Sequence, residues 1–145
     1  MFTIESFTIK DKESTGIAFE IRRKVFVEEQ HVDQREEYDE HEEEARHYLL
    51  FADNKPAGTA RWRLTGNGIK LERFAVLPQY RNQGAGSALV RKVMEDVIVF
   101  NKPVYLHSQA AAVNLYRRAG FEQDGELFYE ANIPHYKMTF RKTVA

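Results

Sequence analysis

One stretch constrains the fold of this chain more than any other: an apolar segment that ends in a proline and leads into two glycines and a helical pattern. Residues 71–77 are mostly apolar and compatible with a strand, and Pro78 ends that segment. Gly84 and Gly86 then open a region, 89–100, in which apolar residues recur at spacings of three and four. The stretch therefore predicts a strand, a glycine loop and the start of a helix, in that order.

A glycine loop that leads into a helix is suited to binding an anion. The first N–H groups of a helix have no partner within it and lie at the positive end of its dipole, while glycines let a phosphate approach the backbone. Two glycines alone are also compatible with a plain turn. The two common nucleotide motifs are disfavoured. Ala88 and Leu89 follow Ser87 where the dinucleotide fingerprint needs a third glycine, and no Lys-Ser or Lys-Thr follows as in a P-loop.

Two motifs carry a resemblance to a known family. Arg81-x-x-Gly84-x-Gly86, after a segment ending in proline, resembles the pyrophosphate-binding motif of the GNAT superfamily of acyl-CoA-dependent N-acetyltransferases. Residues 115–121, Leu-Tyr-Arg-Arg-Ala-Gly-Phe, are similar to the Leu-Tyr-x-x-x-Gly-Phe motif that closes the CoA site in that superfamily. Residues 23–30 resemble the first helix of its ElaA-like members, and residues 132–135 resemble a segment of its ElaA-like and YjcF-like members.

The resemblance implies a single GNAT domain over residues 1–145, with an α/β (α+β) fold. We expect a mixed, largely antiparallel sheet flanked by helices, with a parallel central strand pair opening onto the acyl-CoA site. Hydrophobic periodicity predicts the elements independently. The expected strands are 2–10, 47–52, 56–64, 69–77, 104–108, 121–129 and 136–142, and the expected helices are 14–26, 85–100 and 110–119.

The resemblance also implies the site residues and the co-substrate, acetyl-CoA. Tyr116 matches the tyrosine that donates a proton to the departing CoA thiolate, and the amide of Val76 or Leu77 is the expected donor to the thioester oxygen. Glu72 matches a region that supplies a general base, with an ion pair to Arg63 or Arg73 as its alternative role; His107 and His135 are competing bases. The predicted cofactor-binding residues are Val76, Leu77, Arg81, Gln83, Gly84, Ala85, Gly86, Ser87, Gln109 and Tyr116.

Charge is distributed unevenly along the chain, although the formal net charge is only −1. Residues 1–72 hold 11 basic and 16 acidic residues, and residues 73–145 hold 10 and 6, so the predicted phosphate-binding half is the basic one. Residues 36–44 contain seven carboxylates. This run is interpreted either as a solvated face or as an acidic wall that attracts a cationic amine. Arg22 and Arg23 are expected on the solvated face of the first helix.

Composition limits the remaining function classes. The absence of cysteine removes disulfides, thiolate zinc sites and a cysteine nucleophile, and the five histidines lack metal-ligand spacing, so no metal is expected. No basic run suggests nucleic acid, and no apolar run of about 18 residues suggests a membrane span. These absences favour a cytoplasmic protein, and the resemblance implies a monomer or homodimer that acetylates a primary amine by direct attack. The alternatives are a non-catalytic acyl-CoA sensor or interaction module of the same fold, and a nucleotide-binding protein.

Overall fold

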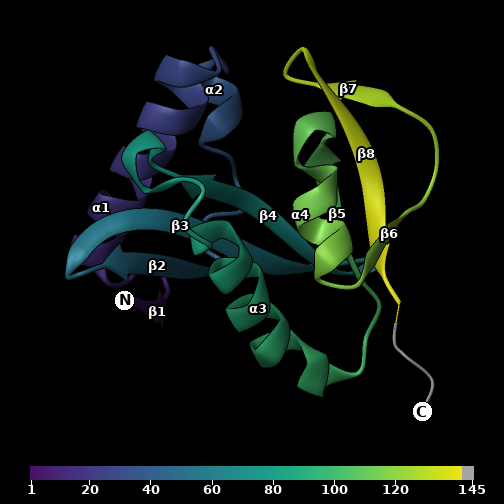
Figure 1. Cartoon of the computed structure of the whole chain (residues 1–145), viewed down its shortest axis with the longest axis horizontal. Helices are drawn as coiled ribbons and strands as arrows, with labels where there is room; N and C mark the ends of the chain where they lie inside the picture. Colours follow the sequence, from purple (N-terminus) through teal and green to yellow (C-terminus); the bar gives the residue numbers. More distant parts are fainter. Residues whose placement is uncertain (142–145) are drawn as a thin grey trace.

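The computed structural model describes residues 1–141, and the predicted end of the last strand at 142 lies outside them. The strands are β1 (Phe2–Phe7), β2 (Arg46–Ala52), β3 (Lys55–Thr65), β4 (Gly68–Val76), β5 (Val104–Gln109), β6 (Phe121–Gln123), β7 (Phe128–Glu130) and β8 (Ile133–Phe140). The α-helices are α1 (Lys12–Arg22), α2 (Gln34–Glu37), α3 (Ala85–Val97) and α4 (Val113–Arg118) (Figure 1). A π-helical turn η1 (Arg23–Glu29) continues α1, and 3₁₀ turns are η2 (Pro78–Tyr80), η3 (Ile98–Phe100) and η4 (Ala110–Ala112).

The eight strands form one mixed sheet, which confirms the predicted fold class. Its order is β1-β2-β3-β4-β5-β8-β6, with β7 paired to β8. The β4–β5 pair is parallel and is connected through α3, and the other pairs are antiparallel. Short two-residue turns join the antiparallel hairpins, whereas the parallel pair requires the helical crossover.

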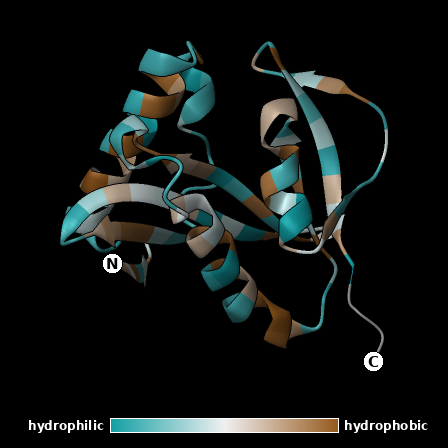
Figure 2. Cartoon of the chain, in the orientation of Figure 1, coloured by the Kyte–Doolittle hydropathy of each residue, from teal (hydrophilic) through white to brown (hydrophobic). Residues whose placement is uncertain are grey.

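Two hydrophobic clusters hold helices against opposite faces of the sheet. Leu89, Val93 and Val97 of α3 are fully buried against β2, β3 and β4. Ile21 of α1 and Val25 of η1 belong to the second cluster, on the other face. Figure 2 shows brown and teal segments alternating along α1 and α3, as expected for amphipathic helices. Their apolar spacing therefore determines which side of each helix covers the sheet.

The central strands β4 and β5 diverge, and this divergence creates the cleft described below. Residues 69–71 pair with 104–106, and within the described chain the parallel ladder goes no further. A β-bulge follows in β4, where Arg73 has φ +58° and two residues oppose one on β3. Because of the bulge, Glu72 lies on the same face as Ala75. In a regular strand Glu72 would share the face of Val76, four residues further on, and the bulge places it on the opposite face instead.

The boundaries of several predicted elements also differ. The first strand ends at Phe7 rather than at residue 10, because Asp11 caps α1 by accepting a hydrogen bond from the amide of Ser14. The strand predicted at 121–129 is two strands, separated by a segment in which Gly125 has φ +113°. The last strand begins at Ile133 rather than at residue 136, after a two-residue turn.

Candidate active site

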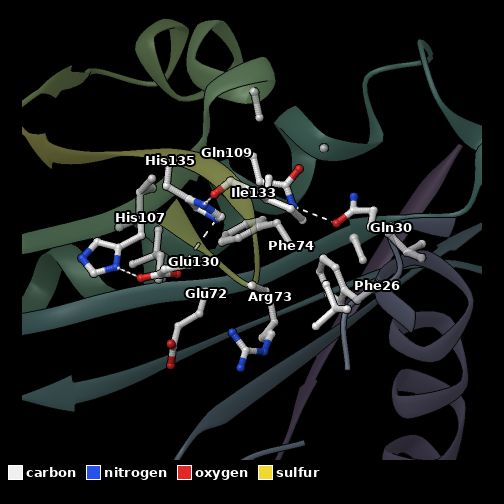
Figure 3. A pocket seen from close by; sticks show the side chains of 18 of the residues that line it. Phe26, Gln30, Glu72, Arg73, Phe74, His107, Gln109, Glu130, Ile133 and His135 are labelled. Carbon is white, nitrogen blue, oxygen red and sulfur yellow. Dashed lines mark hydrogen bonds and ion pairs between the residues drawn. The ribbon is translucent and has the colours of Figure 1, made fainter. Parts of the chain in front are cut away.

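A cleft opens where β4 and β5 separate. It has a volume of about 390 Å³ and is lined by residues of β4, β5, η1, the start of α3, the region of α4 and the β7–β8 hairpin. Figure 3 shows the labelled side chains that line it. The cleft lies at the carboxyl ends of the parallel strand pair, the position at which α/β sheets bind ligands.

The glycine loop presents unpaired amides at one end of this cleft. Gly84 caps α3 with φ +89°, and the first helical bond runs from the amide of Ala88 to the carbonyl of Gly84. Within residues 1–141, the amides of 83–87 have no hydrogen-bond partner. A Cβ at position 84 would meet no atom within 4 Å, and one at Gly86 would touch only Leu115. The loop therefore fits an anionic group such as a pyrophosphate.

The side chains of Arg81 and Gln83 make contacts within the protein. The Arg81 guanidinium donates to both carboxylate oxygens of Glu29, over 2.6 and 2.7 Å, and its Nε donates to the carbonyl of Val76 over 2.9 Å. The hydrogen bond from Arg81 lowers the pKa of Glu29. Gln83 donates to the Gln79 carbonyl over 3.2 Å. These contacts position the loop, and direct binding of a cofactor by these two side chains stays a prediction.

The structure distinguishes the two amides considered as donors to a thioester oxygen. The Leu77 amide donates to the Ala57 carbonyl over 2.8 Å, so it is already paired. Val76 pairs with Gly58, the next position along the ladder. Hydrogen-bonded and non-hydrogen-bonded pairs alternate in antiparallel ladders, so the Val76 amide points away from β3 and toward the diverging β5. Val76 is therefore the better candidate of the two.

Tyr116 lies in the wall of the cleft, on α4. Its side chain is buried, with its ring edge-to-face with Phe74 at 5.7 Å and with Phe121 at 6.3 Å between centroids. Within the described residues its hydroxyl makes no hydrogen bond, and burial raises the pKa of the phenol. Tyr116 is thus a neutral O–H donor held rigidly by aromatic packing.

Gln109 connects two walls of the cleft. It lies at the end of β5, and its Nε2 donates to Oε1 of Gln30, which follows η1, over 2.8 Å (Figure 3). Both residues line the cleft. Gln109 therefore reaches the region in which the resemblance placed it, while a direct contact with a cofactor stays a prediction.

Glu72 has the ion-pair role that was its alternative. Its carboxylate accepts hydrogen bonds from Arg61 over 3.0 Å and from Arg63 over 2.6 Å, and the ammonium of Lys70 lies 3.5 Å away. Burial is the largest single influence on the pKa of Glu72 and raises it. The neighbouring cations together outweigh burial, so the pKa of Glu72 lies below its usual value. Arg73, the other partner considered, pairs with Glu37 and Asp39 instead. The catalytic role of Glu72 stays a prediction.

The acidic run at 36–44 divides into inward and outward carboxylates. Glu37 and Glu42 are buried against Arg22, and Asp39 and Glu42 pair with Arg61. We call these five residues, with Glu72 and Arg73, the ion-pair network. The expectation that Arg22 is solvated is therefore wrong, since it is only 1% exposed. The remaining carboxylates of the run are exposed: Glu36, Glu40, Glu43 and Glu44.

The solvated-face interpretation of the run thus holds for four of its carboxylates and fails for three. It fails because arginines distant in sequence pack against the inward carboxylates and supply their counter-charges. The acidic-wall interpretation also loses much of its charge in this way. From the sequence alone, every carboxylate in the run counts as a negative charge without a partner, because the distant arginines cannot be placed.

A cluster that the sequence analysis did not assemble lies in the same cleft. Oε1 of Glu130 lies 2.7 Å from Nδ1 of His107, and Oε2 lies 4.0 Å from Nε2 of His135 (Figure 3). The hydrogen bond with His107 is the largest influence on Glu130 and lowers its pKa. The two histidines had been separate candidate bases, and the sequence offered no signal that placed Glu130 between them.

Two further classes of feature are absent from residues 1–141. No group of three or more histidine, aspartate or glutamate side chains there is arranged to hold a metal ion. In the same part of the chain, no helix has the length and apolar character needed to cross a membrane.

Comparison with known proteins gives a consistent result. The family model described as Acetyltransferase (GNAT) domain matches residues 8–142. The uncharacterized N-acetyltransferase YjcF of Bacillus subtilis is 36% identical over 132 residues, covering 89% of this chain and 94% of that protein. The uncharacterized protein YyaT of the same organism is 39% identical over 126 residues, covering 84% and 85%.

Solved structures with the same fold include Escherichia coli ElaA, with a TM-score of 0.86 and 24% identity over 97% of this chain and 100% of that one. The PaiA N-acetyltransferase of Thermoplasma acidophilum, solved in complex with coenzyme A, has a TM-score of 0.70 and 16% identity over 98% and 99%. At these identities the structures establish the fold. The family match over residues 8–142 and the two relatives at 36% and 39% identity show that the chain belongs to the GNAT acetyltransferase family.

Proposed function

We propose that this protein transfers an acetyl group from acetyl-CoA to a primary amine by direct attack of the amine on the thioester. One observation carries the proposal: a single cleft is lined by Val76, whose amide points away from β3, by Tyr116 with its hydroxyl, and by Gly86 of the unpaired-amide segment 83–87. Pyrophosphate binding, carbonyl polarisation and thiolate protonation each require one of these groups.

The roles follow from the chemistry of the transfer. The amides of 83–87 would bind the pyrophosphate, and the gap between β4 and β5 would hold the pantetheine arm. The Val76 amide would donate to the thioester oxygen as negative charge develops on it. Tyr116 would give its proton to the sulfur as the carbon–sulfur bond breaks. The transfer uses no covalent enzyme intermediate.

The absence of cysteine suits a reducing compartment, and we infer a cytoplasmic protein. We also infer a monomer or homodimer, which gel filtration would distinguish. Neither inference affects the chemistry above.

Two measurements test the proposal. Thermal unfolding with CoA, ATP or NAD should show stabilisation by CoA, and stabilisation by ATP or NAD alone would support the nucleotide-binding alternative. Thiol release from acetyl-CoA should then depend on an added amine, followed with a thiol reagent across a panel of primary amines. CoA binding without thiol release for any amine would instead support an acyl-CoA sensor of the same fold.

A further inference from the structure

The strand register places three titratable side chains on one face of the sheet. His135 of β8 pairs with Phe128 of β7 on one side and with Gln109 of β5 on the other. Paired residues in a sheet point to the same face, and so do residues two apart in a strand. Glu130, two residues after Phe128, and His107, two residues before Gln109, therefore share the face of His135. All three line the cleft.

The hydrogen bonds indicate where each imidazole carries its proton. Nδ1 of His135 lies 2.7 Å from the carbonyl oxygen of Ile133, which can only accept, so Nδ1 is the protonated nitrogen. Nδ1 of His107 lies 2.7 Å from the Glu130 carboxylate and donates to it in the same way. In the neutral ring of His135, Nε2 is then left with a free lone pair.

That lone pair faces a carboxylate oxygen across an unbridged gap. Nε2 of His135 and Oε2 of Glu130 are 4.0 Å apart, too far for a hydrogen bond. Both atoms are acceptors, so a group that donates to both belongs between them. An ammonium supplies several N–H donors and the positive charge that a carboxylate binds. A neutral group would offer fewer donors, and an acidic group would bring a negative charge that the Glu130 carboxylate repels.

The surroundings leave Glu130 available to a ligand. Its side chain is 42% exposed, and its charged or titratable neighbours are His107 on β5, His135 on β8 and Lys70 on β4. The Lys70 ammonium is 3.5 Å from Glu72, so it already has a carboxylate partner. Glu130 therefore differs from the inward carboxylates of the acidic run, which arginines neutralise.

We propose that Glu130 binds the ammonium form of the acceptor and that Nε2 of His135 removes its proton, while His107 holds the Glu130 carboxylate in place. The proposal rests on the proposed function and identifies its acceptor class as primary amines that are protonated in solution. Glu130 and His135 would be catalytic residues, because they touch the substrate. His107 would be a positioning residue, because it acts through Glu130.

The proton balance of the transfer is complete with these groups. The ammonium gives one proton to Nε2 of His135, which passes it to solvent, and the freed lone pair attacks the thioester carbon. As the carbon–sulfur bond breaks, the thiolate takes the proton of Tyr116. The nitrogen then gives its second proton to the Tyr116 oxygen, through water, and keeps its third as the amide N–H. The products are the N-acetyl amide, CoA thiol and one proton in solution.

Kinetics of matched variants test the two catalytic roles. Glu130→Gln should raise the amine KM about tenfold or more, because a charge-assisted contact is lost. His135→Asn should lower kcat by about 100-fold or more, because the general base is removed. The KM for acetyl-CoA should change little in both. Glu126→Gln and His31→Asn are matched controls, since both side chains are exposed and outside the cleft. They should behave as the wild type.

A pair of substitutions tests His107 separately. Asparagine keeps an N–H donor for Glu130, whereas alanine removes it. His107→Ala should raise the amine KM, and His107→Asn should keep the amine KM close to that of the wild type. Equal defects in both variants would contradict the positioning role.

A binding experiment separates failure of this proposal from failure of the proposed function. Imidazole NMR signals of the CoA complex are followed while spermidine is added. The signals of His107 and His135 should shift in the wild type but not in Glu130→Gln, and no shift in the wild type would overturn the acceptor site. If the wild type releases thiol with amines and both catalytic variants match its rates, the acceptor site is wrong and the proposed function stands. If no amine supports thiol release, the proposed function fails, and the NMR titration still decides whether the cluster binds an amine.

Discussion

Arg61 and Glu72 face each other directly across the β3–β4 ladder, with Nη2 of Arg61 3.0 Å from Oε1 of Glu72. Arg61 is fully buried, and it also contacts Asp39 over 2.7 Å and Glu42 over 2.8 Å. One guanidinium therefore joins the loop after α2 to the central strands beside the cleft. Two atoms of the ion-pair network, Oε2 of Glu37 and Nε of Arg61, are buried without a hydrogen bond within the described residues.

Removing Arg61 should destabilise the protein strongly. Arg61→Met keeps much of the side-chain volume but removes one of the two arginine partners of Asp39, Glu42 and Glu72, and loss of one partner from a buried ion pair costs about 3–5 kcal/mol. Urea unfolding measures the change in the free energy of unfolding. Arg35→Met is the matched control, because the Arg35 side chain is 91% exposed and its ion pair with Asp33 should contribute nothing measurable. Equal stability of the two variants would contradict the importance of the network.

The ion-pair network should also make stability depend on pH in the acid range. Burial is the largest influence on Asp39, Glu42 and Glu72 and raises the pKa of each, but the neighbouring cations together outweigh it and leave each pKa lowered. A lowered folded-state pKa stabilises the protein above the unfolded-state pKa of about 4, and this stabilisation disappears as the pH falls through the folded-state value. Burial instead raises the pKa of Glu37, so its contribution has the opposite sign and offsets part of the loss.

The free energy of unfolding should accordingly fall as the pH is lowered from about 5 to about 3. Urea titrations at several pH values measure this dependence. Arg61→Met should show a shallower dependence than the wild type, because the carboxyls lose the charge that lowers their pKa. Parallel curves for the two proteins would mean that other groups control acid stability.

Gly84→Ala should weaken CoA binding. Gly84 has φ +89°, a conformation that costs other residues about 1–2 kcal/mol, and the added methyl would extend into open space at the loop whose amides are unpaired. Calorimetry should show a CoA Kd raised about tenfold or more, since that factor corresponds to about 1.4 kcal/mol. Gly16→Ala, within α1 and with no atom near its added Cβ, should leave the Kd unchanged and stabilise the helix slightly. An unchanged Kd in Gly84→Ala would mean that the glycine loop is not part of the CoA-binding site.

Tyr116→Phe should lower turnover while stability changes little. The substitution keeps the ring packing against Phe74 and Phe121, and the lost hydroxyl makes no hydrogen bond within the described residues. General acid catalysis typically contributes about 100-fold or more, so kcat should fall by about that factor. Tyr129→Phe, at a position 66% exposed on β7, serves as the control and should be as active as the wild type. Equal kcat values for Tyr116→Phe and the wild type would refute the proton-donor role.

Local sequence determined the framework of the protein. The strand, glycine loop and helix of residues 71–97 were predictable because hydrophobic spacing, a proline stop and glycines act over a few neighbouring positions. The hairpin of β2 and β3 was predictable for the same reason, with Asp53 and Asn54 in its turn at positive φ. The family motifs lie within these locally specified segments.

Only the tertiary structure decided the charge state and neighbours of the candidate site residues. Glu37, Asp39 and Glu42 look equivalent to their exposed neighbours in the sequence, and they differ because distant arginines pack against them. Glu130 meets His107 across 23 positions of sequence because the β5–β8 and β7–β8 registers coincide at the cleft. Burial and ionic partners depend on which surfaces meet, and the divergence of β4 and β5 that opens the cleft arises from strand pairing rather than from any one segment.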